Sequence, residues 1–231
     1  MGFPYVKEAE YKCRESGFMV PHSVIDAMNK IDRTLFVPQR ERARAKNDWA
    51  IPILDGQTTS APHMVMMMLS AAEIKEGDIV LEIGTGSGYN TALLSLLVGS
   101  KGKVYSIERK ELLIEFAKRN LSKVNLPSNY EILHGDGTKG IEGQEFDKIL
   151  VTAAGPFIPS PLCWQLKIGG IMIIPVQRGS FQYLLKVSRL PEGKQEECIY
   201  CNPEDEYPPL AVKELTGVRF VRLIGDYGFK D

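Results

Sequence analysis

One short segment, Leu81-Glu82-Ile83-Gly84-Thr85-Gly86-Ser87-Gly88-Tyr89-Asn90, limits the possible fold more than any other. The apolar run at 79–84 predicts a buried strand that ends in glycine, and 90–98 predicts an apolar helix. A glycine turn between a strand and a helix lets the backbone approach a ligand at the carboxyl end of the strand. The spacing differs from a dinucleotide fingerprint, because that pattern needs its third glycine three residues after the second. No P-loop pattern, G-x-x-x-x-G-K-[ST], occurs either.

The chain alternates between predicted strands and helices after this segment. We expect further strands at 103–107, 130–134, 148–151 and 170–176, and helices at 90–98, 110–123 and 161–166. Strands separated by helices form βαβ units, so the pattern predicts an α/β fold: a doubly wound, mostly parallel, Rossmann-like sheet with helices on both faces. We expect later strands, which could be antiparallel, at 183–190 and 217–223, and an exposed, charged, proline-rich excursion at 191–215.

The first third of the chain is predicted to be mainly helical. Apolar residues at 24, 25, 28 and 31 predict a helix with Ser23 as its N-cap. A second helix is predicted to begin at Pro62, since proline is favoured at a first helical position, and to continue to Ala72. The segment 49–61 between them is predicted to be a loop. We expect a single domain over 1–231, with an N-terminal helical segment (1–77), a ligand-binding core (78–176) and C-terminal strands and loop (177–231).

Two acidic residues follow the next two predicted strands. Glu108 lies 20 residues after Gly88, where a carboxylate can bind both hydroxyls of a ribose. Asp136, in a Gly-Asp-Gly turn, is expected to stand over the same crevice, where it can accept a hydrogen bond from an exocyclic adenine amine. Either acid alone could be a solvated turn residue. Together they fit an adenosine that is held without a pyrophosphate.

A second informative segment precedes Pro62. Thr58, Thr59 and Ser60 place hydroxyls just before a helix N-terminus, where unpaired amides and the helix dipole favour an anion such as a substrate carboxylate. The alternative is that Ser60 or Thr59 simply caps the helix, which is a common role for these residues. The residues by themselves leave both roles open.

Both segments resemble known protein families. The E-x-G-x-G-x-G pattern from Glu82, the acid after the second strand and the GDG after the third resemble the S-adenosylmethionine (AdoMet) methyltransferases of the Rossmann-like class. The sequence DGQTTSAPHM at 55–64 resembles the GQTxSxPHMV segment of protein-L-isoaspartate O-methyltransferases. That second similarity continues through 82–95, 106–109, 134–140, 166–176 and 221–229, so it covers nearly the whole chain.

The resemblance implies an AdoMet-dependent enzyme that methylates the free carboxylate of L-isoaspartyl residues in damaged proteins and peptides. Its cofactor product would be S-adenosyl-L-homocysteine, and the methyl ester would collapse to a succinimide, which initiates repair. The resemblance implies that Ser60 is catalytic and that Thr58, Thr59, Ser60 and Val221 bind the substrate. The expected cofactor-binding residues are Thr58, Thr59, Ser60, His63, Glu82, Gly84, Thr85, Gly86, Ser87, Gly88, Asn90, Glu108, Arg109, Asp136 and Gly137.

This chemistry needs neither a metal nor a general base. A carboxylate, with a reference pKa of about 4, is already ionised at neutral pH. Catalysis should therefore come mostly from placing its oxygen about 3 Å from the methyl group and from excluding water. The three histidines are too scattered to suggest zinc. Cys198 and Cys201 form a lone C-x-x-C, which we interpret as having no catalytic role, with a structural disulfide or incidental thiols left open.

Composition argues against several other classes of protein. The 28 Lys+Arg and 29 Asp+Glu give a net charge of −1, which does not favour nucleic acid as a partner, so the basic run at 40–46 is interpreted as a solvated face. No apolar run reaches the roughly 18 residues that span a bilayer. Four cysteines are too few for a disulfide scaffold. We expect a cytoplasmic protein without a membrane partner, whose oligomeric state the sequence leaves undetermined.

Two other functions share part of this pattern. An AdoMet enzyme that acts on a small molecule or RNA would have the same cofactor residues and would differ at 58–64. A non-catalytic AdoMet-binding module would have that segment degraded, whereas TTSAPHM is intact. One residue departs from the family pattern: Arg222 stands where the family usually has proline. Peptide preference is therefore the property in which we expect this chain to differ.

Overall fold

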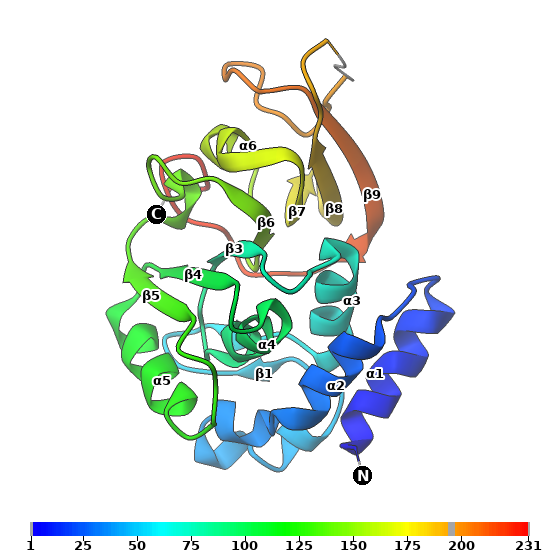
Figure 1. Ribbon diagram of the computed structural model, residues 1–231, viewed down its shortest axis with the longest axis vertical. Coiled ribbons are helices and arrows are strands. Elements are labelled where there is room, and N and C mark those ends of the chain that lie inside the picture. Colours follow the sequence, from blue (N-terminus) through cyan, green and yellow to red (C-terminus); the bar gives the residue numbers. More distant parts are fainter. Residues whose placement is uncertain (1, 194–196, 231) are drawn as a thin grey trace.

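A seven-stranded sheet runs through the computed structural model, which describes residues 2–193 and 197–230. The strands lie in the order β5-β4-β3-β6-β7-β8-β9, from left to right in Figure 1. Strands β3 to β7 pair in parallel, while β8 and β9 pair antiparallel. The strands are β3 (Ile79–Ile83), β4 (Lys103–Glu108), β5 (Tyr130–His134), β6 (Phe146–Val151), β7 (Leu166–Arg178), β8 (Phe181–Arg189) and β9 (Leu210–Val218).

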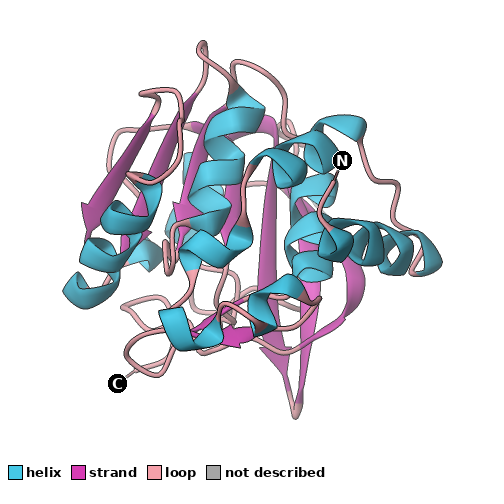
Figure 2. Ribbon diagram, turned by 90° about the horizontal axis from the view of Figure 1, so that it is seen from below, coloured by secondary structure: helices cyan, strands magenta, loops and turns pink. Residues whose placement is uncertain are grey.

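Most of the helices gather on one face of this sheet, in front of the strands in Figure 2. On that face Val80 and Leu150 of the sheet pack against the apolar sides of the first four helices. The opposite face, with Leu81 and Ile149, packs against α6 and the later loops. The predicted doubly wound α/β fold is therefore confirmed. The helices are α1 (Pro4–Glu15), α2 (His22–Lys30), α3 (Pro62–Ala72), α4 (Tyr89–Val98), α5 (Glu111–Leu121) and α6 (Ser160–Gln165).

The central strand shows why the sequence pattern was informative. β3 lies between β4 and β6 and is covered on both faces, so four of its five residues are buried. A strand covered on both faces needs a continuous apolar run, which Val80, Leu81 and Ile83 supply. The predicted strands at 79–84, 103–107 and 130–134 are confirmed to within one residue. The polar exception in β3 is Glu82, which belongs to the functional site.

Two predictions about the end of the chain are wrong. The strand expected at 217–223 is instead β9, which begins at Leu210 opposite Arg189 of β8. The excursion at 191–215 is shorter than expected for the same reason, and its residues 194–196 lie outside the described part of the chain. The charged pair Lys213 and Glu214 obscured this strand in the sequence. Both are exposed although successive strand residues point to opposite faces, because β9 is the edge strand of the sheet.

The chain after β9 runs back across the carboxyl ends of the strands, shown in red in Figure 1. Arg222 forms an isolated parallel bridge with Ala154, which follows β6. Farther along, the backbone amide of Asp226 donates a 2.8 Å hydrogen bond to the carboxylate of Asp136, which follows β5. The C-terminal segment therefore closes the same edge of the sheet at which the glycine loop lies.

Two details of the N-terminal segment also differ from the predictions. α2 begins at His22 with Pro21 at the N-cap, so Ser23 lies inside the first turn and caps nothing. The expected loop at 49–61 contains a small antiparallel hairpin of β1 (Ile51–Pro52) and β2 (Thr58–Thr59). The predicted helix from Pro62 to Ala72 is confirmed.

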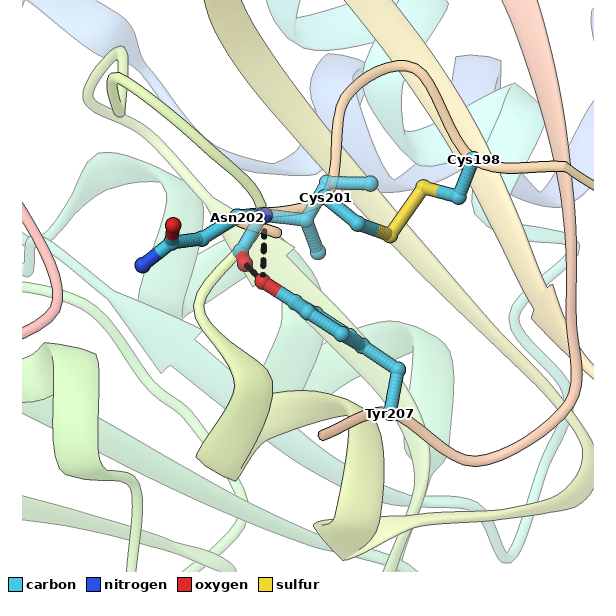
Figure 3. The surroundings of a disulfide bond; sticks show 5 residues. Cys198, Cys201, Asn202 and Tyr207 are labelled. Atoms are coloured by element: carbon cyan, nitrogen blue, oxygen red, sulfur yellow. Dashed lines mark hydrogen bonds between the residues drawn. A yellow bond between two sulfur atoms is a disulfide. The ribbon is translucent and has the colours of Figure 1, made fainter. Parts of the chain in front are cut away.

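The C-x-x-C segment forms a disulfide, which resolves the alternative that the sequence left open (Figure 3). Cys198 and Cys201 are joined in the loop between β8 and β9. The next residue, Asn202, donates its backbone amide to the hydroxyl of Tyr207, which itself donates to the carbonyl of Ile158. The disulfide thus stiffens a loop that is fastened to the chain just before α6.

A buried arginine joins the N-terminal helices to the segment that precedes α3. Arg33 has no exposed surface, and its guanidinium donates to the carbonyl oxygens of Ala45, Asn47, Trp49 and Ser60 at 2.7 to 3.3 Å. These oxygens lie in irregular backbone, where few amides are available to them. Buried carbonyl oxygens need hydrogen-bond donors. The Arg33 side chain supplies these donors to a stretch of chain whose carbonyl oxygens are not paired in a helix or a sheet.

We expect Arg33→Met to lower the free energy of unfolding by about 3 kcal/mol or more, because each buried acceptor left without a donor costs about 1–3 kcal/mol. Urea unfolding followed by circular dichroism measures this loss. Arg14→Met is the control: Arg14 is mostly exposed and, among the described residues, its side chain pairs with Glu10 one turn away, so its loss should cost no more than about 0.5 kcal/mol. Equal losses in the two variants would contradict the role assigned to Arg33.

Candidate active site

A cavity lies at the carboxyl ends of β3, β4 and β6, against the β1–β2 hairpin. The chain continues from β3 to β4 on one side and returns to β6 on the other, and ligands of open α/β sheets bind where the strand order reverses in this way. The residues lining this cavity, the cofactor cavity, are Gln57–Ser60, Val65, Met68, Ile83–Ser87, Tyr89, Asn90, Ile107–Lys110, Leu113, Gly137, Thr152, Ala153 and Val221–Ile224.

The glycine loop has a backbone that other residues rarely adopt. Gly84, Gly86 and Gly88 have φ angles of 94°, 55° and 83°. A Cβ on Gly84 would collide with the side chain of Thr152, while Gly88 forms the N-cap of α4. The loop therefore brings bare backbone to the cavity wall, as close approach to a ligand requires.

Glu108 lies at the end of β4 with its carboxylate on the cavity wall. One oxygen accepts a 3.0 Å hydrogen bond from the amide of Gly86, and the other accepts a 3.1 Å bond from the amide of Lys110. These two bonds orient the carboxylate and leave lone pairs on both oxygens. The position suits the predicted contact with ribose hydroxyls.

Glu82 does not line the cavity but lies beneath it, with no exposed surface. Its carboxylate accepts hydrogen bonds from Asn90 and Thr91 in the first turn of α4 and from Ser106 of β4. Burial raises the pKa of Glu82 to about 7, although the three hydrogen bonds act in the opposite direction. Glu82 thus helps to shape the loop between β3 and α4, and its predicted cofactor contact stays a prediction.

Asp136 is also absent from the cavity wall. One carboxylate oxygen accepts hydrogen bonds from the amide and the hydroxyl of Thr138, and the other accepts from the amide of Asp226. The neighbouring Gly137 does line the cavity, packed so closely on Ile83 that a Cβ would collide with it. The Gly-Asp-Gly turn thus fastens the C-terminal segment beside the cavity, and its predicted adenine contact stays a prediction.

A second cavity adjoins the first, and we call it the surface groove. It is bordered by the exposed rings of Trp49 and Phe181, which are 54% and 69% exposed. The other lining residues come from the segment before α3, the first turn of α3, the β7–β8 hairpin and 217–221, together with Thr152 after β6. The two cavities share Thr58, Ser60, Thr152 and Val221, so they meet beside the hydroxyl-bearing residues that precede α3.

The interpretation of Ser60 or Thr59 as the cap of α3 is wrong. The N-cap residue is Ala61, whose side chain makes no capping hydrogen bond. Instead the carboxylate of Asp48 accepts a 2.7 Å hydrogen bond from the amide of His63 in the first turn. The Ser60 hydroxyl makes no hydrogen bond within the described part of the chain, so it is available at the junction of the two cavities.

The structure brings together most, but not all, of the predicted site residues. Those that line the cofactor cavity are Thr58, Thr59, Ser60, Gly84, Thr85, Gly86, Ser87, Asn90, Glu108, Arg109, Gly137 and Val221. Glu82, Gly88 and Asp136 lie outside its wall, and His63 lines the surface groove instead. His63 therefore borders the surface groove rather than the cofactor cavity, and its predicted contact with the cofactor stays a prediction.

Several functional positions were missed in the sequence. Thr152 lines both cavities, and its hydroxyl donates to the carbonyl oxygens of Ile83 and Gly84 at 2.9 Å. Its place directly after the predicted strand 148–151 was a usable signal. Asp48 gave no such signal, because it lies in irregular chain far in sequence from its partner His63.

Glu82→Gln tests the buried carboxylate. The folded-state pKa of about 7 lies above the usual 4.5, so the native state holds the proton more tightly and wild-type stability falls as pH rises from about 4.5 to 7. Glutamine cannot lose a proton, and the fall should be absent. We expect urea titrations to show that the unfolding free energy of Glu82→Gln, relative to that of the wild type, rises steadily between about pH 4.5 and pH 7. A difference independent of pH would contradict the raised pKa.

Sequence comparisons agree with this arrangement. The family model described as "Protein-L-isoaspartate(D-aspartate) O-methyltransferase (PCMT)" matches residues 7–223. The chain is 44% identical over 210 residues to the protein-L-isoaspartate O-methyltransferase of Ignicoccus hospitalis, covering 90% of this chain and 92% of the relative. It is 45% identical over 212 residues to that of Pyrococcus abyssi, covering 90% and 89%.

Solved structures share the fold. A putative protein-L-isoaspartate O-methyltransferase from Plasmodium falciparum, in complex with S-adenosyl-L-homocysteine, superposes with a TM-score of 0.75 at 23% identity and covers 97% of this chain and 99% of its own. A second protein-L-isoaspartate O-methyltransferase has the same TM-score, 0.75, at 26% identity, with 96% of this chain and 67% of the other covered. The chain belongs to the protein-L-isoaspartate O-methyltransferase family.

Proposed function

We propose that this protein transfers the methyl group of AdoMet to the free carboxylate of L-isoaspartyl residues in damaged proteins and peptides. The observation that carries the proposal is the meeting of the two cavities at Thr58, Ser60, Thr152 and Val221. The cofactor cavity has the glycine loop and the acid that suit an adenosine, while the surface groove suits a peptide. Direct transfer requires donor and acceptor to meet at one point, which this junction provides.

The cofactor side consists of the glycine loop and the acids at the strand ends. Glu108 would bind the ribose hydroxyls, and Gly84 and Gly86 would let the backbone approach the ligand. Glu82 supports the loop from beneath. Asp136 would reach the adenine through the lone pairs that Thr138 and Asp226 leave free. When bound, AdoMet supplies an electrophilic methyl group on a sulfonium sulfur.

The substrate side needs only to hold a carboxylate in place. An α-carboxylate is ionised at neutral pH, so no general base has to activate it. The hydroxyl of Ser60, which is not used for capping, would donate a hydrogen bond to one carboxylate oxygen. The other oxygen would then point toward the methyl group. Thr58 and the backbone of Val221 complete this end of the groove.

The product ester would collapse to a succinimide as a backbone amide nitrogen displaces methanol. Water would then reopen the succinimide partly to normal aspartate and so repair the chain. We propose one domain over 1–231, with an N-terminal substrate segment (1–77), the AdoMet-binding core (78–176) and C-terminal strands and loop (177–231). The net charge of −1 suits an enzyme that must accept damaged sites on both acidic and basic proteins. Neither a metal, a nucleic acid nor a membrane is part of the proposal, and a cytoplasmic location stays a prediction.

No helix among residues 2–193 and 197–230 is both long and apolar enough to cross a membrane. Within the same residues, no group of three or more His, Cys, Asp or Glu side chains is placed to hold a metal ion.

A paired peptide assay tests the function. The protein is incubated with methyl-labelled AdoMet and a peptide that contains one isoaspartyl linkage, beside the same peptide with normal aspartate. We expect base-labile label only in the isoaspartyl peptide. Equal labelling of both peptides, or labelling of neither, would overturn the proposal.

Ser60→Ala should lower kcat/KM for the isoaspartyl peptide about 10- to 100-fold, since one hydrogen bond to a charged group contributes roughly 1.5–3 kcal/mol. AdoMet affinity and thermal stability should barely change, because Asp48 and not Ser60 caps α3. Ser23→Ala, an exposed serine in the first turn of α2, is the matched control and should behave as wild type. A loss of stability in Ser60→Ala would restore the capping role.

Glu108→Gln should weaken AdoMet binding about tenfold or more in calorimetry, because a charged acceptor for two ribose hydroxyls becomes a neutral one. Glu111→Gln, three residues farther and with its side chain 84% exposed, should leave the affinity unchanged. Asp136→Ala is also expected to weaken AdoMet binding. Unchanged affinity in that variant would refute the adenine contact while leaving the ribose contact standing.

A further inference from the structure

A buried carboxylate lies beside the surface groove and is shared by two elements far apart in sequence. The side chain of Asp48 is 0% exposed. One oxygen accepts the amide of His63 at 2.7 Å, and the other lies 2.7 Å from both Nδ1 of His63 and Nζ of Lys12. Lys12 belongs to α1, so this carboxylate links the N-terminal helix to the first turn of α3. The Cys13 thiol of α1 adds a direct 3.4 Å hydrogen bond to the His63 carbonyl oxygen.

The carboxylate is ionised at neutral pH. Burial alone would raise the pKa of Asp48, but the hydrogen bonds from His63 and Lys12 outweigh burial and hold that pKa at about 2. An ionised carboxylate can only accept hydrogen bonds. The hydrogen between Asp48 and His63 therefore sits on Nδ1, and in the neutral ring Nε2 is left as an acceptor.

The second ring nitrogen, Nε2, belongs to a side chain that borders the surface groove. The His63 side chain is 30% exposed and lines the surface groove together with Ser60 and Val221. Within the described part of the chain, Nε2 of His63 has no hydrogen-bond partner. The surface groove therefore has a hydrogen-bond acceptor in Nε2 of His63. The hydrogen bond from Nδ1 to Asp48, on the other side of the ring, keeps Nε2 an acceptor.

We propose that Asp48 is a positioning residue, which fixes His63 in the tautomer that presents Nε2 as an acceptor to a backbone N–H of the bound peptide beside its isoaspartyl residue. Lys12 has a second effect on the same site. It neutralises a buried negative charge that would otherwise repel the substrate carboxylate across a medium of low dielectric constant. This inference rests on the proposed function, because it assigns the surface groove to the peptide.

The two oxygens of Asp48 have different hydrogen-bond partners, so Asp48→Asn can separate their roles. The amide oxygen can still accept the His63 backbone amide and so preserve the cap of α3. The amide nitrogen can only donate, so it forces Nδ1 to become the acceptor and moves the ring hydrogen to Nε2. At the same time Lys12 loses the Asp48 carboxylate as a hydrogen-bond acceptor. A capping role alone predicts little change in this variant.

The first measurement is the tautomer itself. Nitrogen-15 spectra of histidine-labelled protein distinguish an Nδ1–H ring from an Nε2–H ring, and His63→Gln identifies the signal among the three histidines. We expect Nδ1–H in the wild type and Nε2–H in Asp48→Asn. A wild-type ring with its hydrogen on Nε2 would overturn the proposal, and this result needs no variant of Asp48 that folds.

The second measurement is the kinetic split. We expect KM for the isoaspartyl peptide to rise about tenfold in Asp48→Asn, as loss of one hydrogen bond allows, with the AdoMet dissociation constant within twofold of wild type. Lys12→Met should raise the same KM several-fold. Glu8→Gln is its matched control, since it removes the exposed partner of Lys12 and leaves Asp48 intact, and should change KM less than twofold.

The outcomes separate this inference from the proposed function. If wild-type protein methylates the isoaspartyl peptide but Asp48→Asn keeps its KM, the positioning role of Asp48 is wrong and the function stands. A tenfold weaker AdoMet affinity in Asp48→Asn would also overturn the inference, because it would indicate general damage to the site. If wild-type protein labels no isoaspartyl peptide, the proposed function fails, and the tautomer spectra still decide the effect of Asp48 on His63.

Discussion

Two buried charged side chains, Arg33 and Asp48, hold in place the segment that precedes α3, where Thr58 and Ser60 border both cavities. Arg33 donates to four carbonyl oxygens between Ala45 and Ser60, and Asp48 accepts the first free amide of α3 at His63. The segment has only two-residue strands of its own, so its backbone groups find few partners in regular structure. Charged side chains satisfy them instead, and the Ser60 hydroxyl remains available for substrate.

The cofactor side is organised differently, because its parts belong to the ends of regular elements. Parallel strands bring their carboxyl ends to one edge of the sheet, so the loop after β3, Glu108 after β4 and Thr152 after β6 meet without further support. Within that frame the buried Glu82 joins β3 to the first turn of α4 and to β4. The wall of the cofactor cavity thus comes mainly from the ends of regular elements. The surface groove combines the irregular chain before α3 with the β7–β8 hairpin and 217–221, and methyl transfer is proposed where the two cavities meet.

The site could be predicted from the sequence as far as local rules apply. A glycine turn after an apolar strand and an acid after the next strand have fixed consequences in a parallel sheet, so the loop and Glu108 lie where expected. Glu82 shows the limit: the alternation of a strand does not tell whether a polar side chain faces a ligand or a helix terminus beneath it. His63 shows another limit, because which cavity a residue in the first turn of α3 lines depends on the distant β8–β9 end of the sheet.

By itself, the sequence determined the α/β alternation, the strand-turn-helix loop, the family and most residues of the cofactor wall, because each follows from short-range pattern or local similarity. Only the tertiary structure decided which residue caps α3, where the last strand begins and which residues line the surface groove. Those outcomes rest on contacts between residues distant in the chain, such as Asp48 with Lys12 and His63, whose partners are chosen by packing and by the need to satisfy buried charge. No local spacing encodes that choice, and so the substrate side became clear only once the chain was folded.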